Sequence, residues 1–345
     1  MDFQQALAKL VVLALRLKIA PQETLRLPAH NKGNTLRGAF GIAFRRLVCI
    51  PQCRGASACP LGHRCPYKVV FEPSPTPEAE RLTKSQDSPR PFVFRPPPES
   101  KAAYLPGEHF EFGLVLVGSS VDYLPYFVLS FRDIARQGFG PGRARCELNE
   151  VLALLPAGHS REACPPRRRG SGNPLEDQHV YGAEDKLFHT PTAGALGDWV
   201  NLRLGQFGIN GSGEPVRRIT VRFLTPTALK FEERVVRRPE FHHLFKRLRD
   251  RLNALSTFYG HGPIEADFKG LGERSEQVQT VESDVRWLER SRVSSKTHQR
   301  HELSGFVGAC TYEGELAEFI PWLAAGELVG VGRHTTWGNG QYTIP

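Results

Sequence analysis

One order of secondary structure elements occurs twice along this 345-residue chain. In each half, an apolar segment with alternating side chains runs into a proline, at residues 13–21 and again at residues 219–226. This pattern predicts a strand with one buried face, closed by a residue that cannot donate to a ladder. A segment with helical spacing of apolar residues follows in each half. These residues are Leu36, Phe40, Phe44 and Leu47 in the first half and Phe241, Leu244, Phe245, Leu248, Leu252, Leu255 and Phe258 in the second.

Each half also closes in the same way. Residues 126–137 predict a helix, which is followed by the glycine-rich segment 138–142 and a strand. Residues 315–325 predict a second helix, which is followed by the glycine-rich segment 330–340 and the last strand. The order strand, helix, strand, strand, helix, strand is that of a ferredoxin-like unit. We therefore predict an α+β protein of two tandem ferredoxin-like (RRM-like, βαββαβ) domains with a cysteine-rich insertion.

The two units set the predicted domain boundaries. Residues 1–155 form the first domain, which contains a cysteine block at 49–65 and a proline-rich excursion at 73–98. Residues 216–345 form the second domain, which ends in the glycine-rich loop. Residues 156–215 are predicted to be a linker with extra strands. Its apolar residues, too many for a linker alone, include Phe188, Leu196, Trp199, Leu202 and Leu204.

The charge of the chain favours an anionic polymer as partner. The formal net charge is +9 and the isoelectric point is about 9.3, in a globular composition with 40% hydrophobic residues. Such an excess attracts nucleic acid mainly through its phosphates. The most apolar segment near the start, residues 10–20, is broken by Arg16 and Lys18 and is shorter than the roughly 18 residues of a membrane span. We therefore expect no membrane association and a cytoplasmic location, where the odd number of seven cysteines argues against a disulfide framework.

The glycine-rich segment 330–340, called the glycine arc below, has the composition of a nucleic-acid-binding loop. Two Gly-x-Gly pairs enclose Arg333 to Trp337. Glycine allows backbone N–H groups to approach a phosphate chain, Arg333 adds a cation, and Trp337 can stack on a base. The residues predicted to bind RNA here are Gly330, Gly332, Arg333, His334, Trp337, Gly338 and Gly340. The alternative is a turn before a terminal strand, with Trp337 packed beneath it.

Residues 286–301 form a second basic segment. The cations predicted to contact phosphate are Arg286, Arg290, Arg292, Lys296 and Arg300. His298 and His301 lie among them, and Glu289 is the only acid in this segment. This composition suits a phosphate-contacting surface, and the alternative is a solvated face.

The cysteine block predicts a metal site. Cys49, Cys53, Cys59 and Cys65 lie within seventeen residues, among glycine and proline turns, with His63 between them. Four soft ligands so close in sequence can surround a tetrahedral zinc ion. The same thiolates suit an iron–sulfur cluster, and unliganded thiols are the third alternative. We favour structural zinc.

Taken together, these motifs resemble the CRISPR-associated endoribonucleases that process precursor CRISPR RNA, members of the repeat-associated mysterious protein superfamily. The mark of that family is a C-terminal Gly-h-Gly, five residues, Gly-h-Gly, where h is hydrophobic. It is present here as Gly330-Val331-Gly332 and Gly338-Asn339-Gly340, with Asn339 at the second h position. Residues 36–41, 65–67 and 71–73, and Trp287 followed by Arg290-Ser291, are similar to family members. The resemblance covers nearly the whole chain and weakens across 156–215.

The resemblance implies cleavage of RNA without metal. The ribose 2′-hydroxyl attacks the adjacent phosphorus and leaves a 2′,3′-cyclic phosphate, so the reaction needs a base, an acid and a cation. The family places its histidine in or near the first helix of the first domain. Here that histidine is His30, with Lys32 and Arg45 as candidate cations, and no cofactor is implied for catalysis. Arg46, His298 and His301 are the alternatives.

Two functions remain open on this reading. The first is an endoribonuclease that binds CRISPR repeat RNA and cleaves precursor transcripts into guide RNAs. The second is a non-cleaving RNA-binding subunit of a CRISPR effector complex. Both imply the same RNA, and both allow other subunits of that complex as partners. A zinc-stabilised DNA-binding regulator is disfavoured, because no helix-turn-helix or zinc-finger pattern is present.

Overall fold

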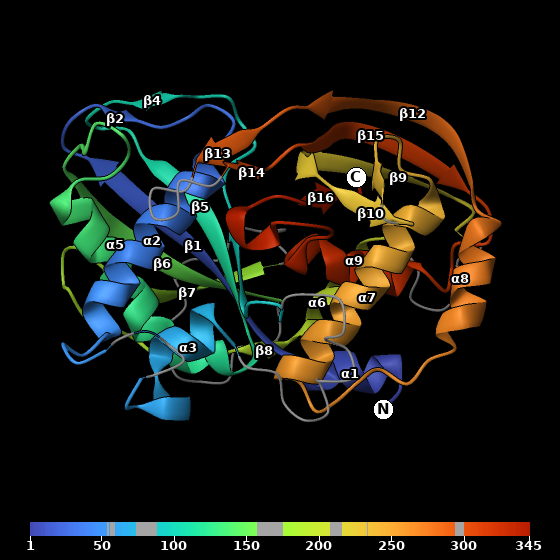
Figure 1. The fold of residues 1–345 in the computed structure, drawn as a ribbon, viewed down its shortest axis with the longest axis horizontal. Coiled ribbons are helices and arrows are strands. Elements are labelled where there is room, and N and C mark those ends of the chain that lie inside the picture. Colours follow the sequence, from blue (N-terminus) through green and yellow to red (C-terminus); the bar gives the residue numbers. More distant parts are fainter. Residues whose placement is uncertain are drawn as a thin grey trace.

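Two antiparallel sheets, each with its own helices, lie side by side in the computed structural model (Figure 1). The structure describes residues 1–53, 55, 59–73, 88–156, 175–207, 216–232, 234–293 and 300–345. We call the two halves the N-terminal and C-terminal lobes. The proline-rich residues 74–87 and the predicted linker residues 157–174 and 208–215 lie outside the described ranges.

The N-terminal lobe has the predicted ferredoxin-like topology. Its elements follow in the order β1 (Val11–Pro21), α2 (Lys32–Val48), β3 (Phe92–Arg95), β5 (Phe110–Val117), α5 (Leu124–Gln137) and β6 (Cys146–Pro156). The strands pair in the order β3-β5-β1-β6, and every pair is antiparallel. This is the βαββαβ arrangement, which confirms the predicted fold of this half. The intervening segment adds β7 (Leu175–Gly182) beside β6 and β8 (Gly194–Ala195) beside β1.

The C-terminal lobe repeats this topology. Its elements are β9 (Arg218–Thr227), α7 (Phe241–Tyr259), β12 (Gln279–Leu288), β15 (Gly305–Glu313), α9 (Ile320–Val329) and β16 (Tyr342–Thr343). The strand order is β12-β15-β9-β16, with antiparallel pairs throughout. Each strand therefore has the position of its counterpart in the N-terminal lobe, and the prediction of tandem ferredoxin-like units is confirmed.

The remaining elements surround these two sheets. The helical ones are α1 (Phe3–Lys9), η2 (Gly62–Arg64), α3 (Pro66–Phe71), η3 (Gly118–Tyr123), α6 (Leu196–Gln206), α8 (Phe268–Glu276) and η4 (Thr335–Trp337). The short strands are β2 (Leu25–Arg26), β4 (Ala103–Tyr104), β10 (Leu229–Phe231), β11 (Arg234–Val236), β13 (Ser291–Val293) and β14 (Arg300–Glu302). Every helix in the described ranges is too short or too polar to span a bilayer.

Strand β1 links two hydrophobic cores. Leu13, Leu15 and Leu17 point to one face and pack in the core beneath α2 and α5. Val12 and Ala14 point to the other face and join the core of the C-terminal lobe. This division follows from the two-residue period of a strand. The lobes therefore share apolar contacts across the back of the first sheet.

Two predictions of helical detail were wrong. The helix expected at 315–325 begins only at Ile320, because Pro321 fits the first turn of a helix, where its missing N–H is not needed. Leu47, placed on the buried face of the first helix, is 44% exposed near the end of α2.

The segment between the two units, predicted as a linker with extra strands, contains both a helix and a strand. Trp199, Leu202 and Leu204 belong to helix α6, while residues 175–182 form the extra strand β7.

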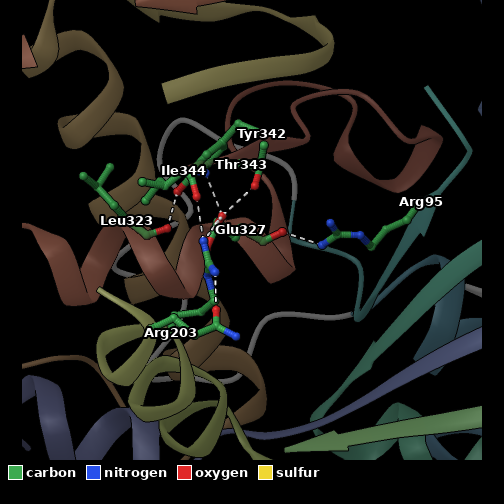
Figure 2. Close-up of polar contacts among 8 residues, drawn as sticks. Arg95, Arg203, Leu323, Glu327, Tyr342, Thr343 and Ile344 are labelled. Carbon is green, nitrogen blue, oxygen red and sulfur yellow. Dashed lines mark hydrogen bonds and ion pairs between the residues drawn. The ribbon is translucent and has the colours of Figure 1, made fainter. Parts of the chain in front are cut away.

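Polar contacts fasten the two lobes at the end of α9 (Figure 2). Arg95 of β3 donates to the carbonyl oxygens of Glu327 and Leu328, the second at 3.1 Å. A cation is favourable there because the last carbonyls of a helix lack intrahelical partners. Burial lowers the pKa of the Arg95 guanidinium, and the nearby Glu327 carboxylate opposes that shift. Glu327 also binds Arg203 of α6, so all three segments meet at one helix end.

Candidate nucleic-acid interface

The glycine arc is anchored to the C-terminal lobe by its own backbone. Val331 donates to the carbonyl of Gly340 at 2.9 Å, and Arg333 donates to that of Ala228 at 3.1 Å. Gly330 and Gly332 have φ values of 73° and 79°, which favour glycine. The arc is therefore a closed loop with a fixed shape, placed where the strand β9 ends.

The prediction that the glycine N–H groups of the arc bind phosphate was wrong for three of them. Gly330 donates to the carbonyl of Gly326, Gly338 to that of Thr335, and Gly340 to that of Pro226. These donors are used within the protein, so they do not offer a phosphate cradle. Their physical role is close packing: a β carbon at Gly338 would overlap Pro96 of the other lobe.

The arc also contacts the first helix of the N-terminal lobe. A β carbon at Gly33, in the first turn of α2, would overlap the carbonyl oxygen of Trp337. Only glycine permits this approach of two backbones. His30 lies three residues before Gly33, and His334 lies three residues before Trp337. Each histidine is thus within about 11 Å of chain from the contact between the lobes.

The open side of the arc presents a cation and an aromatic pair. Arg333 is exposed, and within the described part of the chain it has no acidic partner. The rings of His334 and Trp337 stack with centroids 5.4 Å apart. His334 has a left-handed backbone with φ of 64°, which turns the chain at this point. A cation beside stacked rings can hold a nucleotide through its phosphate and its base.

The three candidate catalytic residues do not form one site. His30 is exposed before α2, whereas Lys32 is only 3% exposed. Lys32 donates to the carbonyl oxygens of Ala29 at 3.1 Å and Glu99 at 2.6 Å. Burial lowers the pKa of the Lys32 ammonium, and the Glu99 carboxylate opposes the shift. Lys32 therefore holds the loop that carries His30 and does not face a substrate.

Arg45 is too far away to share a site with His30. It lies thirteen residues after Lys32 on the same helix, which is about 20 Å along the helix axis. Its side chain is exposed near the end of α2. Arg45, predicted from the sequence as a candidate cation beside His30, is therefore separated from His30 by the length of α2.

The basic segment connects to the glycine arc. The side-chain amide of Asn339 donates to the carbonyl of Leu303 at 3.2 Å, and Leu303 donates to the carbonyl of Arg290 at 2.8 Å. Asn339 is buried, and its hydrogen bond to Leu303 satisfies its side-chain amide. This bond explains why a polar residue can occupy the second hydrophobic position of the glycine motif. Beyond it, strands β13 and β14 extend over the junction of the lobes (Figure 1).

The predicted cations of the basic segment differ in exposure and in whether the structure describes them. Arg286 is exposed on β12, and Arg290 is half-buried with its backbone N–H bound to the hydroxyl of Ser304 at 3.0 Å. Arg292 and Arg300 lie on the paired strands β13 and β14, and their side chains are outside the described part. Lys296 and the alternative His298 lie outside the described residues.

The cysteine block is clustered only in part. Burial, followed by the neighbouring Cys53 thiol, raises the pKa of the Cys49 thiol, and Cys65 is also close enough to contribute. Cys59 and Cys65 are buried. Among the described residues, the groups whose ligand atoms converge within 4.8 Å do not include these cysteines. Four-sulfur coordination of zinc, which remains a prediction, would need these side chains to move closer together.

Three residues that define the interface were missed from the sequence. Gly33 allows the contact between the lobes, Asn339 attaches the arc to the basic segment, and Arg95 caps α9 from the other lobe. A glycine in the first turn of an amphipathic helix was an available signal for Gly33. The roles of Asn339 and Arg95 depend on partners far away in the sequence.

Two ferredoxin-like lobes meet at the glycine arc beside the strand pair β13–β14, an architecture that is common among RNA-binding proteins. Residues 221–342 match the family model of the CRISPR-associated endoribonuclease Cas6. Residues 10–183 match the N-terminal domain model named AF_1859_N. The C-terminal lobe is therefore similar in sequence to the CRISPR-associated endoribonucleases of the Cas6 family.

Solved structures support the fold. A Cas6 product complex is 16% identical, with a TM-score of 0.52 over 97% of this chain and 99% of that one. Thermus thermophilus Cas6 is also 16% identical, with a TM-score of 0.50 over 98% of this chain and all of the other. A partial Cas6-RT-Cas1–Cas2 complex gives 14% identity and a TM-score of 0.54, over 98% of this chain and 46% of that chain. None of the curated proteins matches the chain.

Proposed function

We propose that this chain is a metal-independent endoribonuclease that binds CRISPR repeat RNA and cleaves precursor transcripts to give guide RNAs. The observation that carries the proposal is the contact of Gly33 with the carbonyl of Trp337. It brings a histidine-bearing loop of the first lobe to the cationic and aromatic arc of the second. The match of residues 221–342 to the Cas6 model supports this reaction class, and the contact supports the junction of the lobes as its proposed location.

The chemistry at this junction is an internal transfer within the RNA. The 2′-oxygen forms a bond to the adjacent phosphorus while the bond from phosphorus to the 5′-oxygen breaks, leaving a 2′,3′-cyclic phosphate. A base takes the 2′-hydroxyl proton, and an acid gives a proton to the departing 5′-oxygen. Histidine suits either step because its proton exchanges near neutral pH. A cation must also stabilise the extra negative charge that develops on the non-bridging oxygens of the phosphorus in the transition state.

We assign the proton-transfer role to His30 and the stabilising charge to Arg333. The His30 side chain is exposed, and its loop is held by the bond from Lys32 to Ala29 at 3.1 Å. His334 and Trp337 stack together and would receive a base on their open side. Lys32 is a positioning residue in this mechanism, because its ammonium is bound to two carbonyl oxygens.

The basic segment would hold the RNA backbone on its way to the junction. Arg286 and Arg290 precede strands β13 and β14 in the chain. The hydrogen bond from Asn339 to Leu303 joins the start of this strand pair to the glycine arc. Repeat RNA and its precursor are the proposed substrates. Other CRISPR subunits are proposed partners, since solved relatives include Cas6-RT-Cas1–Cas2 complexes. A cytoplasmic location follows from that substrate.

One observation favours the second function, a non-cleaving subunit that holds guide RNA. Helix α2, from Lys32 to Val48, contains no histidine, which departs from the relatives that carry a histidine within this helix. If His30 does not take part in chemistry, the junction would be a binding surface only.

Incubation of the purified protein with its cognate repeat RNA in excess chelator tests the proposal. Discrete cleavage, with a 3′ fragment end that resists phosphatase until acid opens the cyclic phosphate, supports the enzyme. A shifted but intact RNA supports the binding subunit. Cleavage that requires added Mg²⁺ would contradict the metal-independent mechanism.

A further inference from the structure

Three metal-binding side chains converge at the edge of the N-terminal sheet, apart from the RNA interface. They are His179 on β7, Asp185 in the turn that follows, and His189 on the returning segment. One ligand atom from each lies within 4.8 Å of the other two. The imidazole rings of the two histidines have centroids 5.6 Å apart.

We propose that His179, Asp185 and His189 form a site for a divalent first-row transition metal ion, with zinc as its occupant. Two imidazole nitrogens and one carboxylate oxygen are ligands that zinc accepts, and water completes the tetrahedron. Ligands about 2.1 Å from such an ion lie about 3.4 Å from one another. Because the ligand atoms lie within 4.8 Å of one another, side-chain shifts of about 1 Å bring them to this spacing.

The backbone already holds the two histidines in place. His179 pairs with Leu152 of β6, and the register shifts between Val151 and Leu152. His189 donates its backbone N–H to the carbonyl of Val180 at 2.8 Å, and Tyr181 bridges Phe188. Irregular pairing of this kind redirects side chains at a sheet edge. The hairpin thus presents both rings to the same space before any ion binds.

The carboxylate is oriented as well. The backbone N–H of Leu187 donates to Oδ1 of Asp185 at 3.0 Å, which fixes the carboxylate and leaves its other lone pairs for an ion. Ligands held by a second hydrogen bond in this way bind metals more tightly. The nearest additional carboxylate on the strand, Asp177, is paired with Arg16 at 2.7 Å. The site is therefore a set of two histidines and one aspartate.

Gly182 supplies the open space beneath these ligands. A β carbon at this position would lie 3.0 Å from Nε2 of His179 and 3.3 Å from Oδ1 of Asp185. Gly182 is not among the glycines with positive φ, so its backbone accepts alanine. A Gly182→Ala variant would obstruct the ion and remove none of its ligands.

The second cluster of this kind is less suited to a metal. Glu240, His242 and His243 lie at the start of α7. Nδ1 of His243 accepts the backbone N–H of Glu240 at 3.3 Å, so this nitrogen caps the helix. In the cluster of His179, Asp185 and His189, by contrast, the hydrogen bond that Asp185 accepts from Leu187 orients a carboxylate that keeps other lone pairs for an ion.

Zinc titration calorimetry on tag-free, full-length protein tests the site, with Co²⁺ absorption as a second measurement. We expect His179→Ala, His189→Ala and Gly182→Ala each to weaken binding at least about tenfold. His261→Ala, an exposed histidine elsewhere, should leave it unchanged. Co²⁺ at this site should show no thiolate charge-transfer band, which separates it from any ion held by cysteines.

Two results would overturn the site. One is an unchanged zinc isotherm in Gly182→Ala and in both histidine variants. The other is Co²⁺ absorption that comes only from thiolates and disappears in a Cys59→Ser variant. Circular dichroism checks that each variant is folded. If the histidine variants fail to fold, Asp185→Asn replaces them, because this exposed carboxylate can lose its charge without a change of shape.

Discussion

Arg203 and Glu327 form a two-point ion pair that joins helix α6 to helix α9. The Nε atom of Arg203 lies 2.6 Å from Oε2 of Glu327, and Nη2 lies 3.1 Å from Oε1 (Figure 2). The same guanidinium donates to the carbonyl of Ile344 at 2.7 Å, and the carboxylate accepts the backbone N–H of Ile344 at 2.8 Å. The segment between the two ferredoxin-like units thereby fixes the C-terminal end of the chain.

Replacement of Glu327 by glutamine should destabilise the protein by about 2–3 kcal/mol, because Arg203 would lose its charged partner in a largely buried place. The two side chains are only 26% and 13% exposed. Urea denaturation at neutral pH measures the loss. Glu315→Gln is the matched control, since its pair with Arg217 is 74% and 65% exposed and should contribute less than about 1 kcal/mol. Equal losses in the two variants would contradict this interpretation.

Gly33→Ala should displace the glycine arc and weaken RNA binding. The new methyl group would overlap a backbone oxygen, that of Trp337, which cannot rotate away. We expect a loss of about 1–3 kcal/mol in stability together with lower affinity for repeat RNA in a filter-binding assay. Gly38→Ala, on the same helix, meets no atom within 4 Å and should instead stabilise the protein by about 0.5–1 kcal/mol. Normal RNA affinity in Gly33→Ala would contradict the proposed junction.

The topology was predictable because it depends on local periodicity. The alternation in β1 and β9 and the three-and-four spacing in α2 and α7 are properties of neighbouring residues. They fix which face of each element is buried, and two repeats of the same order leave few ways to assemble a sheet. The Gly-x-Gly pairs likewise marked the arc, although the N–H groups of Gly330, Gly338 and Gly340 are bound within the protein.

The site was less predictable because its geometry depends on distant partners. Lys32 was read as a free cation, yet its ammonium is buried against the carbonyls of Ala29 and Glu99. Arg45 was grouped with His30 although a helix separates them. Arg203 and Glu327 are 124 positions apart, so no local pattern links them. Charge and residue type can be read from sequence, whereas burial and pairing require the fold.

Stability should fall in mild acid because of His242 and His243 at the start of α7. Burial lowers the pKa of both imidazoles, and for His243 the neighbouring His242 lowers it further. The unfolded chain then binds more protons than the folded chain, so the free energy of unfolding decreases as pH falls through about 6.5 and below. Urea denaturation between about pH 7.5 and 5 should show a smaller decrease in a His242→Gln, His243→Gln double variant. An unchanged pH slope would rule out these two residues.

The cysteine block should bind zinc and lose it when Cys59 is changed to serine. Burial raises the pKa of Cys49, so ion binding must release a proton and should weaken in acid. Co²⁺ substitution should give a thiolate charge-transfer band that is absent in Cys59→Ser and present in the control Cys310→Ser, whose thiol lies in strand β15. Metal content that is equal in the Cys59→Ser variant and the parent would reject a cysteine-held ion.

His30→Ala should slow RNA cleavage at saturating substrate by a factor of about 10²–10⁴, the usual contribution of a positioned acid or base. Because His30 is exposed and outside the hydrophobic cores, we expect little change in stability and only a small change in RNA affinity. His334→Ala should have the opposite effect, since the loss of its stack on Trp337 weakens binding more than chemistry. Single-turnover cleavage separates the two steps, with His261→Ala as the control. Full cleavage by His30→Ala would remove His30 from the mechanism and move the search for the acid and base to His334 and His301.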